Sequence, residues 1–144
     1  ETVLRKAAEL ENIRKRTEKE KEEAIKYSNG KFAKDLLSIA DNFERVMENS
    51  ASIKDKTAND TSLKALLDGV LLCKKELLSI FKKHGIFQIE ISDGATFDPQ
   101  CHQAMCEVNS SDHDEGTIIQ VLQMGYMHYD RLLRPAMVTV SKKA

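Results

Sequence analysis

Tryptophan is absent from this 144-residue chain, proline occurs twice, and aromatic residues make up only 6% of it. These deficits argue against a large, compact, aromatic-rich core. The three cysteines are too few, and odd in number, for a disulfide scaffold, and they favour a reducing compartment. No apolar run reaches the roughly 20 residues of a membrane-spanning helix, and the net charge of −1 gives no overall attraction for nucleic acid. We therefore expect neither a membrane nor a nucleic acid as partner.

Helix-forming charged residues are abundant, most of all in residues 1–48. This segment contains no proline and a single glycine, Gly30. Opposite charges recur at helical spacing, for example Asp41 with Arg45, and each such pair supports a helix by roughly 0.2–0.5 kcal/mol. We predict one long helix, which at roughly 1.5 Å per residue would be about 70 Å long. A helix that exceeds the diameter of its own domain needs a packing partner.

The apolar positions of this predicted helix recur every eleven residues, which favours nearly straight or slightly right-handed pairing. The repeat is polar around Arg14, so we expect the first half to pair weakly. The part from Phe32 to Met47 is apolar enough to pack firmly. The residues that fall on one line of the repeat are Val3, Arg14, Ile25, Leu36 and Met47.

Residues 49–60 are polar and predict a loop, with Asp60 among the candidates for a helix cap. A second helix is predicted over 61–85, because leucines recur at positions i, i+3, i+4 and i+7 and Gly85 provides a stop. The two apolar stripes of one chain suit a four-helix bundle assembled from two chains, and hence a homodimer. The predicted dimer interface comprises Phe32, Leu36, Ile39, Phe43, Leu63, Leu66, Leu67, Val70 and Leu77.

Residues 86–144 predict a small β domain of short strands and turns. The segment Gly125–Arg131 is predicted to be a hairpin connection with a glycine bulge. The predicted fold class is therefore α+β, with long paired N-terminal helices, a dimeric four-helix bundle and a small C-terminal β-sheet domain. The predicted strands are Ile86–Ile91, Met105–Val108, Thr117–Met124 and Leu132–Val140.

Cysteine and histidine cluster at Cys101, His102, Cys106 and His113, which raises a metal site or a Cys–His nucleophile as interpretations. The spacing lacks the paired Cys-x2–4-Cys units of zinc sites, and adjacency in sequence does not create catalytic geometry. No glycine-rich phosphate-binding motif occurs either. Ordinary packing and loop positions explain these residues better, so we predict no metal, no cofactor and no catalytic residue. The residues alone indicate a binding protein, with a structural adaptor as one alternative and an enzyme as the disfavoured one.

Short motifs in both halves carry a family pattern. The helical half contains ENIRKRT at 11–17, and the pattern continues over 31–41. The β half contains FDPQCHQA at 97–104, GTII at 116–119, QMGY at 123–126 and RLLRPAMVTV at 131–140. Together these motifs extend over essentially the whole chain, and they resemble the GrpE family of nucleotide exchange factors for DnaK-type chaperones.

The resemblance implies a parallel homodimer with paired long helices, a four-helix bundle and two β wings. One wing would contact the nucleotide-binding domain of a single DnaK-type chaperone and move one lobe outward, so that ADP leaves. Such a co-chaperone would support protein folding and the heat-stress response. The implied location is the bacterial cytoplasm, with the mitochondrial matrix as the alternative. Because the chain begins at Glu1 within a helical pattern and without methionine, we expect a longer natural N-terminus.

The family's chaperone contacts can be carried over by position. One family lysine is replaced by Glu23 here, which reverses the charge, and the position of Leu122 is a methionine in the family. The resemblance therefore predicts a chaperone contact whose helix contribution departs from the family's pattern, with Lys21 or Lys26 as the alternative source of the positive charge. The predicted contact residues are Arg14, Gly69, Leu122, Arg131 and Val140.

Overall fold

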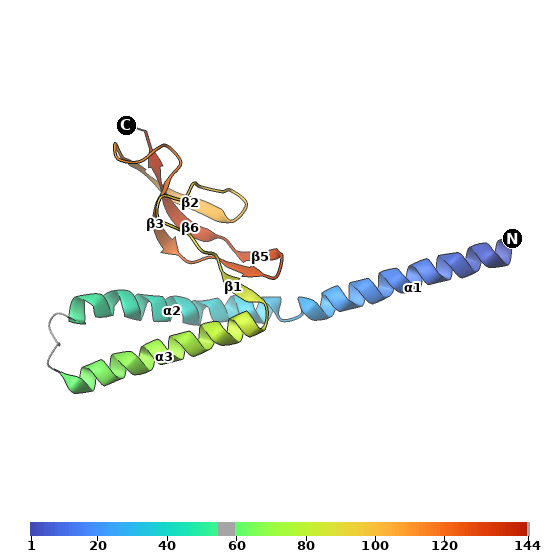
Figure 1. The fold of residues 1–144 in the computed structure, drawn as a ribbon, viewed down its shortest axis with the longest axis horizontal. Helices are drawn as coiled ribbons and strands as arrows, with labels where there is room; N and C mark the ends of the chain where they lie inside the picture. The colour runs from blue at the N-terminus through green and yellow to red at the C-terminus, as the bar shows by residue number, and fades with distance from the viewer. Residues whose placement is uncertain (55–59, 144) are drawn as a thin grey trace. The chain divides into compact units, whose positions relative to one another are not determined.

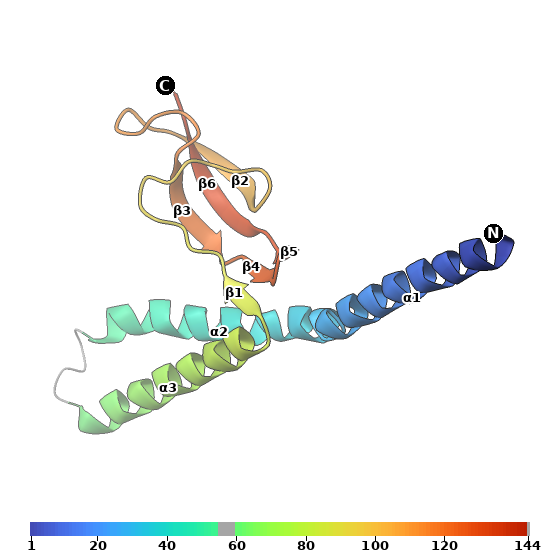
Figure 2. The same ribbon diagram turned by 45° about the vertical axis from the view of Figure 1, so that its right-hand side comes forward.

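The computed structural model describes residues 1–54 and 60–143. The chain divides into two compact units, Glu1–Phe32 and Ala33–Ala144. Its helical elements and strands follow one another along the chain as Figures 1 and 2 show, and they confirm the α+β fold class. The elements are α1 (Thr2–Lys26), α2 (Gly30–Lys54), α3 (Thr61–Lys83), β1 (Ile86–Gln88), β2 (His102–Asn109), β3 (Ile118–Gln123), β4 (Tyr126–His128), β5 (Arg131–Arg134) and β6 (Ala136–Lys142).

Helix α1 is exposed along its whole length, and none of its residues is buried. The prediction of one uninterrupted helix over residues 1–48 is wrong, because α1 ends at Lys26 and a turn precedes α2. Ser28 contributes to this end, since its hydroxyl donates to the Ile25 carbonyl at 2.8 Å. Serine, asparagine and glycine follow in sequence, and all three are weak helix formers.

Helices α2 and α3 differ from their predicted bounds mainly at the loop between them. The predicted loop over 49–60 is wrong at its start, because α2 continues to Lys54; residues 55–59 lie outside the described residues. Asp60 is confirmed as a cap, since its side chain accepts hydrogen bonds from the N–H groups of Ser62 and Leu63 at 3.1 and 3.3 Å. The predicted stop is also confirmed, with Gly85 at φ 80° just after α3.

The β strands form two three-stranded sheets, in the orders β1-β4-β5 and β2-β6-β3. All pairs in the first sheet are antiparallel, whereas β2 and β6 are parallel. Two predictions need correction here. The predicted connection Gly125–Arg131 contains strand β4, and the predicted strand Leu132–Val140 is divided at Pro135 into β5 and β6. Proline has no N–H group to donate to a neighbouring strand, so pairing ends there and the chain passes to the other sheet.

The chain passes between the two sheets three times: over residues 89–101, at Met124–Gly125 and at Pro135. The last two of these connections touch each other. A Cβ atom added to Gly125 would lie 2.4 Å from the backbone nitrogen of Ala136 and 2.9 Å from the carbonyl carbon of Pro135. Position 125 therefore requires glycine, because two backbone segments pass within contact distance.

Two apolar clusters form the core of the unit Ala33–Ala144. One lies within the sheet β2-β6-β3 and contains Ile118, Ala136, Val138 and Val140. The other joins both helices to the sheet β1-β4-β5, so it fixes the β strands against the helical layer. Its buried members are Ala33, Leu37 and Ala40 of α2, Phe81 of α3, Ile86 of β1 and Tyr126 of β4.

A hydrogen bond and a ring contact connect the end of α3 to the hairpin β4–β5. The N–H of Tyr129 donates to the Gly85 carbonyl at 2.8 Å, and Tyr129 itself has φ 53°. The tyrosine ring covers Gly85 so closely that an added Cβ would lie 2.3 Å from the ring. Gly85 is thus required both by its left-handed backbone and by the ring above it.

Candidate partner-binding surface

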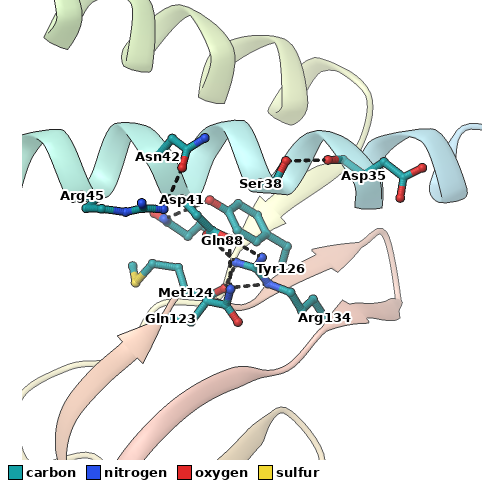
Figure 3. A network of polar contacts seen from close by, with 10 residues as sticks. All are labelled: Asp35, Ser38, Asp41, Asn42, Arg45, Gln88, Gln123, Met124, Tyr126 and Arg134. Carbon is teal, nitrogen blue, oxygen red and sulfur yellow. Dashed lines mark hydrogen bonds and ion pairs between the residues drawn. The ribbon is translucent and has the colours of Figure 1, made fainter.

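The carboxylate of Asp41 on α2 is the centre of a polar cluster between the helices and the β strands (Figure 3). Two guanidinium nitrogens of Arg134 donate to its two oxygens at 2.7 and 2.8 Å. The side-chain amide of Gln123 donates to the same carboxylate at 3.0 Å. Residues more than 80 positions apart in sequence are thereby joined: α2 contacts β3 through Gln123 and β5 through Arg134.

Arg134 is held from three sides. Besides Asp41, its Nε donates to the Met124 carbonyl at 3.1 Å. Its guanidinium carbon also lies 5.4 Å from the centre of the Tyr126 ring, within the range of a cation–π contact. These contacts fix both the position and the plane of the guanidinium group.

Tyr126 lies between this polar cluster and the apolar core. Its ring packs edge-to-face on Phe81, with centroids 6.2 Å apart, and the side chain of Gln88 donates to its hydroxyl at 3.4 Å. Burial raises the pKa of the Tyr126 hydroxyl, and the Asp41 and Glu44 carboxylates act in the same direction against the opposing effects of Gln88 and Arg134. The raised pKa favours the neutral hydroxyl, which lies between the polar cluster and the apolar core.

Beside the cluster, an open cleft of about 250 Å³ separates α2 from β3. The charged side of the cleft comes from α2 and the other side from β3. Leu122 borders it and is 49% exposed. The cleft is lined by Asp41, Glu44, Arg45, Glu48, Val121, Leu122, Gln123 and Met124.

The five predicted contact residues have different surroundings. Leu122 on β3 and Arg131 at the start of β5 are exposed and belong to the β domain. Arg14 is exposed on α1, in the other unit. Gly69 is exposed on α3, and an added Cβ would meet nothing within 4 Å, so no close backbone among the described residues explains this glycine.

Val140 differs from the other predicted contacts because it is only 7% exposed and belongs to the core of the sheet β2-β6-β3. Its remaining surface borders a shallow depression that Phe97 and Ala104 also line. The side chain therefore contributes mainly to packing within the β domain. Its role as a contact stays a prediction.

The predicted dimer residues include several large apolar side chains that the single chain leaves exposed. Leu66 on α3 is 64% exposed, and Phe32 and Ile39 are also exposed. Sequence reasoning missed further exposed apolar residues on the same two helices: Val46, Leu72 and Ile80. The other six predicted residues are half-buried, and two of them, Leu36 and Leu77, pack against the core. The half-buried set is Leu36, Phe43, Leu63, Leu67, Val70 and Leu77.

Three residues of the cysteine and histidine cluster, Cys101, His102 and His113, make local hydrogen bonds. The ring nitrogen Nδ1 of His102 accepts a hydrogen bond from the Asp98 N–H at 3.0 Å, and His113 is 2.8 Å from the Ser110 hydroxyl. Partial burial and the neighbouring Asp98 carboxylate raise the pKa of the Cys101 thiol, opposite to the change that activates a nucleophile. Among residues 1–54 and 60–143, no group of three or more His, Cys, Asp or Glu side chains could hold a metal ion.

The Asp41 cluster was the main feature that the sequence did not reveal. The charge pattern predicts a pair of Asp41 with Arg45 on one helix, but the structure directs the carboxylate to Arg134 instead. Arg45 donates to Asn42 at 2.8 Å. The sequence feature that could have indicated this cluster is Arg134, because it directly precedes Pro135, where the chain passes from one sheet to the other.

These features define the class of protein: an α+β chain with an exposed helix, a helical layer and a small two-sheet domain. Within the described part of the chain, no helix combines the length and apolarity required to cross a membrane. The sequence model of the GrpE family matches residues 1–142. The chain therefore belongs to the GrpE family.

Individual relatives agree with this assignment. The chain is 49% identical over 140 residues to "Protein GrpE" of Zymomonas mobilis, covering 97% of this chain and 71% of the relative. It is 46% identical over 140 residues to the protein of that name from Methylobacterium nodulans, covering 97% and 61%. The protein of that name from Brucella anthropi is also 46% identical, with 97% and 60% covered. The chain thus spans between 60% and 71% of the length of these relatives.

Proposed function

We propose that this chain is an adenyl-nucleotide exchange factor. As a homodimer it binds the nucleotide-binding domain of a DnaK-type chaperone, opens the nucleotide cleft and accelerates ADP release, which supports protein folding and the heat-stress response. The observation that carries this proposal is the family match over residues 1–142, which includes both the helical segments and the β domain. The bacterial relatives favour the bacterial cytoplasm as its location over a mitochondrial matrix.

The proposed activity needs no catalytic group, since it follows from thermodynamic linkage. A protein that binds the open chaperone more tightly than the closed, ADP-bound form must weaken ADP binding by the same factor. To change the open population from 1% to 99%, the preference must be about 5.5 kcal/mol. A few well-placed side chains can supply energy on this scale, and the exposed Leu122 and Arg131 of the β domain are the proposed anchors.

Homodimerisation is supported by the apolar residues that a single chain leaves uncovered. Leu66 on α3 and Ile39 on α2 present large side chains to solvent. Contiguous exposed apolar surface on a monomer usually marks a protein interface. The exposure of α1 adds to this argument, because most helical stability in proteins comes from packing of an apolar face, and α1 leaves apolar residues such as Leu10 and Ile13 exposed.

The exchange activity is tested by following the release of a fluorescent ADP analogue from a purified DnaK-type chaperone. The wild-type protein should accelerate release in a saturable manner. Arg131→Ala should raise the concentration needed for half-maximal acceleration by roughly tenfold or more, whereas Arg5→Ala, which removes an exposed arginine of α1, should not. Binding without acceleration would instead support the adaptor, and an unchanged response with Arg131→Ala would remove that contact from the proposal.

The homodimer is tested by analytical ultracentrifugation. Leu66→Lys places a charge on the exposed apolar helix surface and should shift the protein to the mass of one chain. Met105→Lys is the matched control, because Met105 is also an exposed apolar residue but lies on β2. If the wild-type protein sedimented as one chain at micromolar concentration and still accelerated ADP release, the dimer would not be part of the function.

A further inference from the structure

The β domain is joined to the helical layer by contacts of two different kinds. The apolar cluster of Leu37, Phe81 and Tyr126 brings the layers together, but apolar contacts have little directional preference. The covalent connection runs through Gly85, one residue after the helix cap of α3, and a glycine with positive φ restrains direction only through its neighbour Tyr129. Neither contact is a directional polar link between the β strands and α2, since the apolar cluster has no hydrogen bond and the Tyr129–Gly85 hydrogen bond lies at the end of α3.

The Asp41–Arg134 pair supplies this directional restraint. Its two N–H···O bonds run in parallel from a planar guanidinium to a planar carboxylate, which defines a mutual orientation as well as a distance. The guanidinium is held in turn by the Met124 carbonyl, and the carboxylate by Gln123. The Asp41 carboxylate of α2 is therefore bound by two side chains of the β domain, Arg134 and Gln123, and the Arg134 guanidinium is oriented by its own domain.

The pair is also more sheltered than an ordinary surface ion pair, which contributes about 0–1 kcal/mol. The side chains of Arg134 and Asp41 are 15% and 21% exposed. The Tyr126 ring beneath the guanidinium further excludes water from one face. Loss of one partner would leave the other partly buried and uncompensated, so the pair resists separation.

Asp41, Gln123 and Arg134 form the joint between α2 and the β domain. Two of these residues lie next to the proposed chaperone contacts. Gln123 directly follows Leu122 on β3, and Arg134 lies on the same short strand as Arg131. We infer that Asp41 and Arg134 are positioning residues, which hold the β domain at one orientation on α2 so that Leu122 and Arg131 reach the partner together. This inference rests on the proposed function, but its structural part can be measured without it.

The orientation of the β domain can be read from native cysteines. Cys73 on α3 and Cys106 on β2 are both exposed and accept spin labels, while Cys101 is replaced by serine. Double electron–electron resonance then gives the distribution of distances between the helical layer and the β domain. Labelled protein is diluted with an excess of the unlabelled triple variant Cys73→Ser, Cys101→Ser and Cys106→Ser, so that only distances within one chain are detected.

Asp41→Asn keeps the shape of the side chain but removes its charge, and we expect it to broaden the distance distribution by about twofold. Arg134→Lys should do the same, because lysine cannot form the bidentate pair. Asp35→Asn is the matched control, since it removes another carboxylate of α2 that lies outside the joint (Figure 3). Arg131→Ala should leave the distribution unchanged while it weakens the proposed contact.

In the ADP-release assay, a positioning defect has a distinct signature. Asp41→Asn should raise the half-maximal concentration by about tenfold but leave the rate at saturation unchanged, because only the fraction of correctly oriented domains falls. Circular dichroism establishes that each variant is folded, and Gln123→Ala replaces Asp41→Asn if the latter does not fold.

Unchanged distance distributions in both Asp41→Asn and Arg134→Lys would overturn the inference, as would an equal broadening in Asp35→Asn. Failure of the wild-type protein to accelerate ADP release would overturn the proposed function instead. In that case the distance distributions would still decide whether the joint orients the β domain.

Discussion

Helix α1 and the unit Ala33–Ala144 differ in how much of their structure depends on contacts between distant residues. No residue of α1 is buried in the single chain, and its helical pattern is readable from local spacing and charge. In the larger unit, Leu37 and Val138 are fully buried, and remote segments determine the structure. Local propensity therefore indicates where a helix lies, whereas the placement of a site depends on contacts between distant residues.

The largest expected difference between the two regions is the effect of a leucine substitution on the free energy of unfolding. Leu37→Ala removes a side chain with 0% exposure and should lower the free energy of unfolding by about 2–5 kcal/mol. Leu10→Ala, at a residue 67% exposed on α1, should change it by less than about 0.5 kcal/mol. Urea denaturation at low protein concentration measures both. A comparable loss for Leu10→Ala would mean that α1 is packed in solution.

A smaller effect is expected at the joint between α3 and the β domain. Gly85→Ala should cost about 1–3 kcal/mol more than Gly94→Ala, because both glycines have positive φ but only Gly85 lies under a tyrosine ring. Thermal and urea unfolding of the two variants gives the difference. In a Tyr129→Ala background the extra cost of Gly85→Ala should disappear; if it persisted, the ring would not be its cause.

The helix caps provide a further contrast between the two units. Asp60→Ala removes a side chain that accepts two backbone hydrogen bonds, so stability should fall by about 1 kcal/mol. Glu1→Ala should have almost no effect, since the Glu1 side chain makes no capping bond to α1. Equal losses in chemical denaturation would contradict the assigned role of Asp60.

The smallest expected effect is a dependence of stability on alkaline pH. Because burial raises the folded-state pKa of Tyr126, the associated stability is complete below the unfolded pKa of about 10 and is lost as pH rises through the raised folded value. The slope cannot exceed about 1.4 kcal/mol per pH unit for one proton. Tyr126→Phe should reduce the decline between pH 9 and 11 in urea denaturation. An identical decline in the variant would assign the effect to other groups.

The sequence allowed the fold class, the cap at Asp60 and the stop at Gly85 to be predicted, because each depends on neighbouring residues. It did not reveal the interruption after Lys26, since an apolar repeat continues across it and only weak helix formers mark the turn. The sequence also did not reveal that α2 continues beyond residue 48. The residues there are polar and predicted a loop, but they form helix.

The candidate surface could be predicted only in part. Exposure of Leu122 and Arg131 agrees with the motif-based assignment, whereas the burial of Val140 depends on a sheet whose order is not evident from the chain. The Asp41–Arg134 pair joins residues 93 positions apart, and the nearer Arg45 was the natural partner by helical spacing. Contacts of this range follow from topology rather than from local pattern.

Strand β6 lies at the centre of its sheet, between β2 and β3, although it follows both of them in the chain. During synthesis, β2 and β3 therefore emerge with no neighbour to pair with until β6 is complete. The ladder between β2 and β6 closes over more than 25 intervening residues, which slows its formation because loop closure precedes the gain in contacts. On a ribosome, the helices can form before β6 is synthesised, whereas this sheet cannot. Until then the edges of β2 and β3 are unpaired and can bind chaperones or other nascent chains.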